Sequence, residues 1–288
     1  MPKIAIVTGA NKGIGLEIAR GLAQTAGVHT ILACRNTQLG AQAVEELNKD
    51  VAEGSTIEQR ILDISSSDSI ANFVSSFKAD FPTCDILVNN AAIAFKNADP
   101  TPFAQQASPT ISINYLGTVE LTKQMLSVLP PGARVVNVAS MAGHLKILTN
   151  DEIKKEFTSP TLTEEGLSQL MKDFVSDISS ERATDKWPKT CYGMSKLGVI
   201  AYTRVLARER PDLVVNAVCP GWCATDMSSH SGPRSAEKGA ETPLMLAIDP
   251  AVTSNGGMYK CVIVIDWISI AAAILPLIMS LSRLPLLV

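Results

Sequence analysis

The stretch "TGANKGIG", residues 8–15, decides the fold, because it follows the apolar run Ile4–Val7 and opens a helical pattern. Gly9, Gly13 and Gly15 let the backbone turn tightly and approach a ligand closely. Between a strand and a helix, such a turn directs the helix N-terminal amides at a pyrophosphate. The glycine spacing departs from the commoner Gly-x-Gly-x-x-Gly pattern, and by itself it also suits an ordinary turn. Its place between strand and helix predicts a dinucleotide-binding site.

Downstream of this loop, short β-branched runs alternate with longer helical patterns. This rhythm predicts an α/β fold, a doubly wound parallel sheet with helices on both faces. The predicted strands are "KIAIVT", "TILAC", "IEQRILD", "CDILVNNA", "ARVVNVAS" and "LVVNAVC". The predicted helices lie at about Gly13–Ala26, Thr37–Val51, Ser67–Phe81, Phe103–Leu129, Cys191–Glu209 and Ala236–Leu246.

Residues 144–190 interrupt the alternation with a charged stretch that contains two helix-like segments. We interpret it as a helical insertion in a single domain that spans residues 1–260. The absence of an inter-domain linker or an internal repeat in the sequence supports one domain.

The composition excludes several function classes. A net charge of −3 gives no electrostatic case for nucleic acid or an anionic membrane as partner. The six cysteines lack the paired spacing of a zinc site or a redox motif, and the three histidines are scattered, so we predict no metal. The first apolar run is far too short for a signal peptide. We expect reduced thiols in a cytoplasmic protein.

The C-terminal segment, residues 261–288, is unusually apolar. Sixteen uncharged residues, "WISIAAAILPLIMSLS", lie between Asp266 and Arg283. Three interpretations remain open: a membrane anchor, a strand and helix folded into the domain, or an alternative gene end. A spanning helix needs about 20 apolar residues, and Pro276 and Asp266 disfavour one. We therefore favour an atypical chain end over an anchor.

The end of the second predicted strand indicates which dinucleotide binds. NAD-binding proteins usually place an acidic residue there for the ribose 2′-hydroxyl, but this chain has Arg35. Together with Lys12 in the glycine loop, Arg35 suits a 2′-phosphate and favours NADP(H). The alternative is that Arg35 is a solvated loop charge.

Further cofactor contacts are expected where the next two strands end. Asp63 is placed to accept a hydrogen bond from the adenine amino group, and Asn89 is placed near a ribose. Asp63 could equally cap the following turn, and asparagines are frequent turn residues. The predicted cofactor site also includes Asn11, Ile14 and Ile64.

The stretch "TCYGMSK" places Tyr192 and Lys196 at positions i and i+4, on one helix face. A free tyrosine has a pKa near 10, too high for efficient proton exchange at neutral pH. A neighbouring ammonium favours the phenolate and should lower that pKa. Tyr192 is therefore a candidate general acid for a carbonyl oxygen.

The motifs "TGANKGIG", "NNAA", "INYLGT", "VVNVAS", "YGMSK" and "PGW" occur together in an order that resembles the short-chain dehydrogenase/reductase family. The insertion, "NNAAIAFK" and "CPGWCATDM" resemble more specifically the monomeric NADPH-dependent carbonyl reductases. Two features depart from that pattern: the apolar chain end, and Ala92 where relatives more often have glycine. The resemblance implies a Rossmann-like fold, and a monomer because the insertion covers the surface through which most relatives dimerise. A charged partner-binding surface is the alternative.

The resemblance also assigns roles. It implies that Ser140 stabilises the developing alkoxide, that Lys196 contacts the nicotinamide ribose, and that Asn114 holds a water connecting Lys196 to solvent. Asn114 alone would be taken for a polar residue that kinks a helix. By the same resemblance, the nicotinamide end of NADP(H) is bound by Pro220, Gly221, Thr225, Tyr192 and Lys196, while Trp222 and Met227 either line the substrate pocket or simply pack.

These features predict an NADPH-dependent reductase of aldehydes, ketones or quinones. One alternative is an alcohol, steroid or prostaglandin dehydrogenase that uses the same site. The other is a non-catalytic or membrane-docked variant, in which residues 261–288 provide the only route to a membrane.

Overall fold

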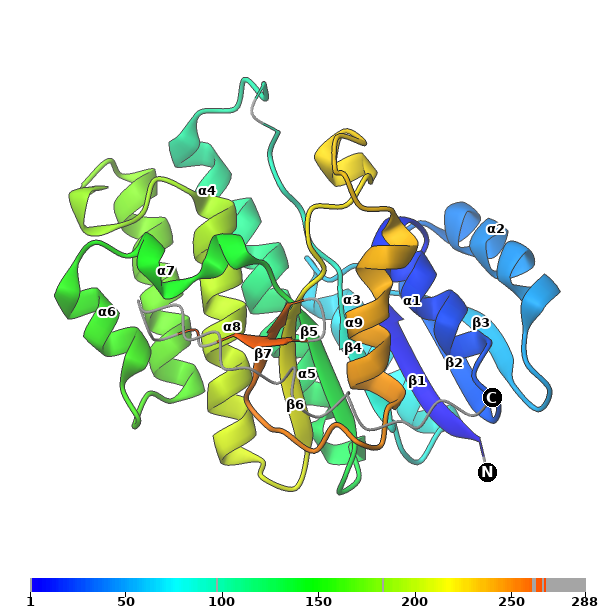
Figure 1. Ribbon diagram of the computed structural model, residues 1–288. Coiled ribbons are helices and arrows are strands. Elements are labelled where there is room, and N and C mark those ends of the chain that lie inside the picture. Colours follow the sequence, from blue (N-terminus) through cyan, green and yellow to red (C-terminus); the bar gives the residue numbers. More distant parts are fainter. Residues whose placement is uncertain (1, 97, 183, 261–262, 266, 268–288) are drawn as a thin grey trace, which may run out of the picture.

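The computed structural model describes residues 2–96, 98–182, 184–260, 263–265 and 267. Within these residues the chain forms an eight-stranded sheet in the order β3-β2-β1-β4-β5-β6-β7-β8 (Figure 1). All neighbouring strands are parallel except β7 and β8, which are antiparallel. The sheet order reverses between β1 and β4, which is where doubly wound folds bind ligands.

The predicted alternation of strands and helices is confirmed, with ends displaced by a few residues. The strands are β1 (Lys3–Thr8), β2 (Val28–Cys34), β3 (Thr56–Ile61), β4 (Ile86–Asn89), β5 (Arg134–Val138), β6 (Val214–Cys219), β7 (Met258–Lys260) and β8 (Ile263–Ile265). The α-helices are α1 (Gly13–Ala23), α2 (Thr37–Leu47), α3 (Ser67–Asp80), α4 (Phe103–Ile111), α5 (Thr118–Met125), α6 (Asp151–Thr158), α7 (Glu164–Ser179), α8 (Cys191–Glu209) and α9 (Ala236–Ile248).

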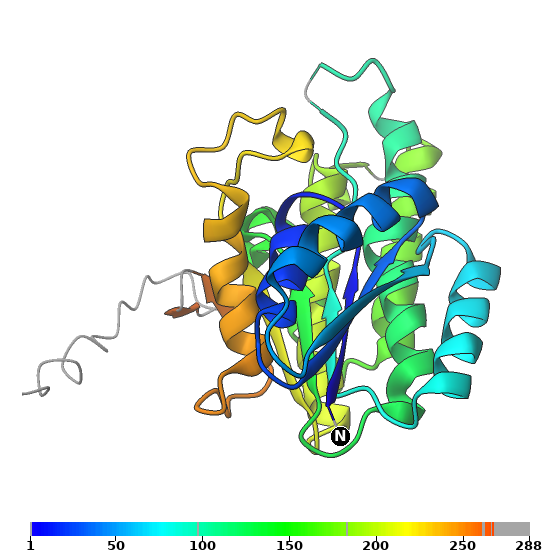
Figure 2. The ribbon, with the colours of Figure 1, turned by 90° about the vertical axis from the view of Figure 1, so that its right-hand side faces the viewer.

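The sheet is buried on both faces because its side chains alternate between two hydrophobic clusters. In β1, Ile4 and Ile6 join the cluster beneath α3, α5 and α8, whereas Ala5 and Val7 join the cluster beneath α1, α2 and α9. Figure 2 shows helices on either side of the sheet. This period-two pattern explains why the strands read as continuous apolar runs.

The predicted long helix near 103–129 is continuous but not uniform. A π-helical segment, Ser112–Gly117, separates α4 from α5 and carries Asn114. A Cβ at Gly117 would collide with the carbonyl oxygen of Ile64, so only glycine allows this close approach. Such π segments inside helices frequently occur at functional sites.

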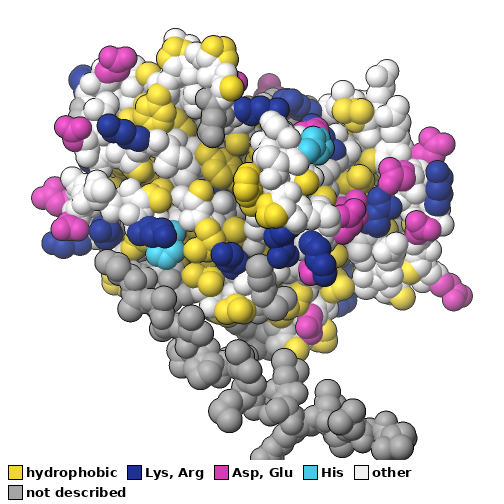
Figure 3. Space-filling view, turned by 45° about the horizontal axis from the view of Figure 1, so that its top comes forward, with side chains coloured by type: hydrophobic (Ala, Val, Ile, Leu, Met, Phe, Trp, Pro, Cys, Tyr) yellow, Lys and Arg dark blue, Asp and Glu magenta, His cyan; other side chains and the backbone are white. Residues whose placement is uncertain are grey.

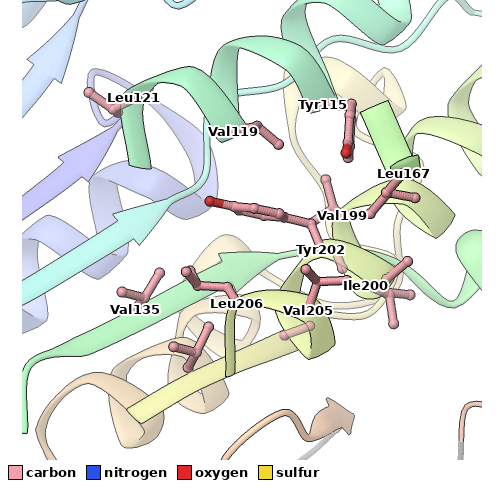
Figure 4. Close-up of a cluster of buried hydrophobic side chains, with 14 of the residues drawn as sticks. Tyr115, Val119, Leu121, Val135, Leu167, Val199, Ile200, Tyr202, Val205 and Leu206 are labelled. Atoms are coloured by element: carbon pink, nitrogen blue, oxygen red, sulfur yellow. The ribbon is translucent and has the colours of Figure 1, made fainter. Parts of the chain in front are cut away.

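The predicted insertion contains the two expected helices, α6 and α7, and α7 packs against α4 and α8. Lys123 of α5 pairs with Glu164 at the start of α7, and Trp187 stacks edge-on against Phe174. The insertion therefore covers the outer surface of α4 and α8, as expected. Figure 4 shows the core beneath it, where Tyr202 of α8 lies near Val119 of α5.

The sheet continues past residue 260, where we expected the domain to end. β8 pairs with β7, and Trp267, beyond β8, is buried against the domain. Part of the apolar segment thus packs on the fold. The question of a membrane anchor falls on residues 268–288, which lie outside the described part of the chain. In the described part, no helix combines the length and apolarity needed to cross a membrane.

Candidate active site

A pocket of about 460 Å³ opens at the carboxyl edge of the sheet, above the ends of the first strands. Figure 3 views this edge, where hydrophobic side chains lie in a hollow and Lys and Arg side chains gather beside it. Ten of the predicted cofactor-binding residues line the pocket: Gly9, Asn11, Lys12, Gly13, Ile14, Gly15, Arg35, Asp63, Ile64 and Thr225. They come from four separate stretches of the chain, so the fold brings them together.

The glycine loop has the backbone that the sequence predicted. Gly9 and Gly13 have positive φ values of 64° and 58°, the left-handed region that favours glycine. A Cβ on Gly15 would lie 2.6 Å from the carbonyl oxygen of Gly9 and would also collide with the Asn90 amide. The side chain of Lys12, which precedes α1, makes no capping bond, so the first-turn amides of α1 remain available to an anion.

Four charged groups line the outer part of the pocket. Arg35 is exposed at the end of β2, and its charge helps to hold the pKa of Asp63 below the usual value, after the larger effect of hydrogen bonds from Ser65. Asp63 thus caps its own turn while lining the pocket. Lys12 pairs at 2.7 Å with Asp226 from the opposite rim. Of the two predicted cations, Arg35 is therefore the less committed to a protein partner.

The structure does not place the side chain of Asn89 in the pocket. Its side-chain amide points into the core, where it donates to Thr122 Oγ1 at 3.0 Å and to Asn137 Oδ1 at 2.8 Å. The next residue, Asn90, lines the pocket and donates to the carbonyl oxygens of Thr8 and Gly9. Successive side chains of a strand point to opposite faces, so only one of the two asparagines can reach the pocket.

Ser140 and Tyr192 come together from two elements. Ser140 follows β5 and begins a short 3₁₀ turn, Met141–Gly143, in which its Oγ accepts a bond from the Ala142 amide at 3.1 Å. Tyr192 lies in the first turn of α8, whose start is capped by Thr190 Oγ1. A hydrogen bond with Ser140 favours the Tyr192 phenolate, but burial outweighs it and raises the pKa of Tyr192 to about 12.

The net shift in the pKa of Tyr192 is therefore opposite to the one that a neighbouring ammonium alone would cause. Lys196 is buried, its Nζ donates to the carbonyl oxygen of Val138 at 2.7 Å, and it lies 5.8 Å from the centroid of the Tyr192 ring. Burial lowers the pKa of Lys196 to about 8. The ammonium faces the aromatic ring, and desolvation of the phenol dominates. Tyr192 is consequently a neutral phenol at physiological pH.

Asn114 connects three elements near this pair. Its Oδ1 accepts from the Ile93 amide at 2.8 Å, and its Nδ2 donates to Ile93 O at 2.9 Å and to Ser195 Oγ at 3.0 Å. The side chain thus joins the π segment to α8 and to the loop after β4. Because Ile93 lines the pocket, Asn114 links the pocket to the Tyr192 helix.

Besides Asn89, six predicted residues are absent from the described pocket lining: Asn114, Ser140, Tyr192, Lys196, Pro220 and Gly221. Gly221 has φ +88°, and a Cβ there would lie 2.7 Å from Arg234 Cδ, so the loop after β6 requires glycine. Of the two residues considered for substrate binding, Met227 lines the pocket, and Trp222 is 62% exposed outside its described lining.

A family model described as "short chain dehydrogenase" matches residues 3–150. A second model, described as "Enoyl-(Acyl carrier protein) reductase", matches residues 162–251. The chain belongs to the short-chain dehydrogenase family. The resemblance drawn from the sequence motifs is thereby confirmed, and this dehydrogenase is an oxidoreductase.

Curated relatives of this short-chain dehydrogenase include "Carbonyl reductase [NADPH] 3" of Rattus norvegicus, 40% identical over 92% of this chain and 98% of the relative. "Carbonyl reductase [NADPH] 1" of Mus musculus is 42% identical over 86% of this chain and 91% of that protein. Among solved structures, salutaridine reductase from Papaver somniferum superimposes with a TM-score of 0.80 at 30% identity, covering 89% of this chain and 99% of the other. Menthone neomenthol reductase from Mentha piperita gives 0.77 at 29% identity, with 91% and 99% coverage.

Among the residues of this dehydrogenase's pocket that sequence reasoning missed are the polar Asn90 and Asp226. Asn90 could have been found by applying the period-two rule to the strand end. Asp226 had no signal in the sequence, because it reaches Lys12 across a separation of 214 residues.

Proposed function

We propose that this chain is an NADPH-dependent carbonyl reductase that acts on aldehydes, ketones or quinones, with Tyr192 as the proton donor. The proposal rests chiefly on Tyr192 and the buried Lys196, whose Nζ lies 5.8 Å from the centroid of the Tyr192 ring, with Ser140 near enough to favour the phenolate. The names of the curated relatives support the same substrate class and cofactor.

The pocket residues fit NADP(H). The turn around Gly9, Gly13 and Gly15 leaves room for a pyrophosphate at the start of α1, and Arg35 offers a planar cation to a 2′-phosphate. When bound, the cofactor supplies the hydride, and the protein supplies position and electrostatics. Asn90, through Thr8 and Gly9, fixes the loop in the shape that the phosphates need.

The proton steps follow from the ionisation states. Tyr192 holds its proton at neutral pH, as a general acid must before it protonates a carbonyl oxygen. The Ser140 hydroxyl then donates to the same oxygen as negative charge develops on it. Lys196 remains charged below about pH 8 and stabilises the phenolate that forms when Tyr192 gives up its proton.

Arg35 favours NADPH over NADH and therefore the reductive direction over oxidation by an alcohol, steroid or prostaglandin dehydrogenase. The hydrogen-bonded catalytic residues favour an active enzyme over a non-catalytic or membrane-docked variant. We further propose that the protein is a monomer, since α7 covers α4 and α8. We also propose that it is cytoplasmic. One reductase domain would extend through Trp267, with small carbonyl compounds as partners.

The proposed function predicts a specific pH profile. The kcat for reduction should be constant below about pH 7 and should fall as pH rises through about 8, because Lys196 then loses the charge that stabilises the phenolate. Initial rates of NADPH oxidation with a panel of quinones, ketones and aldehydes measure this profile. In Lys196→Met the fall in kcat near pH 8 should disappear, and kcat should be low at every pH. Absence of carbonyl-dependent NADPH oxidation at every pH would refute the proposed function.

A further inference from the structure

We propose that Trp267, which follows β8, is a positioning residue for Ser140. Its indole N–H holds the Gly143 carbonyl and so fixes the turn that presents the Ser140 hydroxyl to the substrate oxygen. This inference rests on the proposed function. It also gives a catalytic purpose to the part of the apolar chain end that the structure describes.

Trp267 is firmly docked on the domain. Its side chain is only 4% exposed and belongs to the hydrophobic cluster that includes α8. Nε1 donates to the Gly143 carbonyl oxygen at 3.0 Å in a buried setting. The Arg204 guanidinium of α8 lies over the indole ring, 5.4 Å from its centroid. The antiparallel pairing of β8 with β7 brings the chain to this place.

The turn that accepts the hydrogen bond from Trp267 is also the turn that orients Ser140. The Gly143 amide donates to Ser140 O at 2.9 Å, and the Ala142 amide donates to Ser140 Oγ at 3.1 Å. Both bonds close the same turn. Since Gly143 is its last residue, a bond to the Gly143 carbonyl acts directly on the orientation of Ser140.

The turn also lies directly against the helix that carries Tyr192 and Lys196. A Cβ on Gly143 would collide with the backbone of Lys196 and Leu197, so the peptide of Gly143 is in close contact with α8 on one side. Trp267 holds its carbonyl from another direction. The position of Ser140 relative to Tyr192 therefore depends on a contact made by the chain end.

A small displacement here has a large kinetic consequence, because a misplacement of about 1 Å can cost roughly 10²-fold in rate. Removing the indole donor leaves a buried carbonyl without that partner, and the turn is then free to move towards another donor. The effect should appear in kcat and leave cofactor affinity unchanged, because Trp267 and Gly143 lie outside the described lining of the cofactor pocket.

The test compares two substitutions that each remove one buried indole N–H from the full-length protein. Trp267→Phe keeps an aromatic ring against Arg204 and deletes the donor to Gly143. Trp187→Phe is the matched control, because Trp187 is 3% exposed and donates at 2.9 Å to Asp177 in the insertion. We expect Trp267→Phe to lower kcat about 10-fold with the NADPH Kd within about twofold, and to accelerate amide hydrogen exchange in residues 140–147. Trp187→Phe should change neither.

Unchanged exchange in residues 140–147 in Trp267→Phe would overturn the proposal, whatever happens to kcat. Faster exchange with unchanged kcat would overturn the link to catalysis. If Trp267→Phe folds poorly, replacement of Trp267 by benzothienylalanine, which keeps the ring shape without the N–H, must reproduce the expected result. A wild-type protein without any turnover would refute the proposed function, and the exchange measurement would still decide whether Trp267 fixes the turn.

Discussion

Replacement of Tyr192 by phenylalanine should lower kcat for carbonyl reduction by about 10²–10⁴-fold, the range that a positioned general acid contributes. The substitution removes the hydroxyl that carries the transferable proton and leaves the ring in contact with Lys196. The pKa of about 12 means that almost all wild-type molecules hold that proton at neutral pH. Among the described residues, Tyr192 alone combines the hydrogen bond with Ser140 and a phenol that holds its proton at neutral pH.

Steady-state rates of NADPH oxidation with a ketone or quinone measure the loss, and fluorescence titration with NADPH measures cofactor binding. The Kd for NADPH should stay within about threefold of wild type, because a hydroxyl contributes one hydrogen bond at most to that affinity. Tyr202→Phe is the control, since it removes a buried hydroxyl from the same helix, within the apolar cluster of Figure 4. Loss of activity in both variants would point to a general disturbance of α8 and count against Tyr192 as the acid.

Replacement of Arg35 by aspartate should reverse the cofactor preference, with the ratio of kcat/KM for NADPH over NADH falling about 10³-fold. Hydrogen bonds to charged groups contribute about 1.5–3 kcal/mol, and a carboxylate at this position repels a 2′-phosphate while accepting a bond from a 2′-hydroxyl. The neighbouring Asp63 adds to the repulsion once the Arg35 charge is gone. Lys12 cannot fully compensate, because Asp226 holds its ammonium.

Parallel titrations of both cofactors measure this ratio. Lys49→Asp makes the same change of charge on an exposed residue outside the described pocket lining, so it should leave the ratio unchanged. An Arg35→Asp enzyme that still prefers NADPH to the wild-type extent would show that Arg35 is the solvated loop charge of the alternative interpretation.

The sequence predicted the parts of this molecule that depend on local pattern. The alternation of apolar runs and helical stretches located the strands and helices, and the three glycines of residues 8–15 located the cofactor loop. The spacing of Tyr192 and Lys196 placed both on α8. In each case, the signal lies within one element or at the junction of two.

The features that the sequence did not predict all concern contacts between distant elements. The pKa of Tyr192 rises because the surrounding residues desolvate the phenol, and a one-dimensional pattern does not contain that environment. The side chain of Asn89 points into the core because its amide donates hydrogen bonds there to Thr122 and Asn137. Trp267 looked like one more apolar residue of the chain end, and only the fold places its indole beside Gly143.

In the proposed reaction, hydride reaches the carbonyl carbon from the cofactor while Tyr192 protonates the oxygen. NADPH carrying two deuterium atoms at nicotinamide C4, incubated in ordinary water with the enzyme and a ketone substrate, tests it most directly by mass spectrometry and NMR of the product. We expect an alcohol with deuterium on the carbinol carbon, formed in step with NADPH consumption. An alcohol with only solvent hydrogen on that carbon would contradict it.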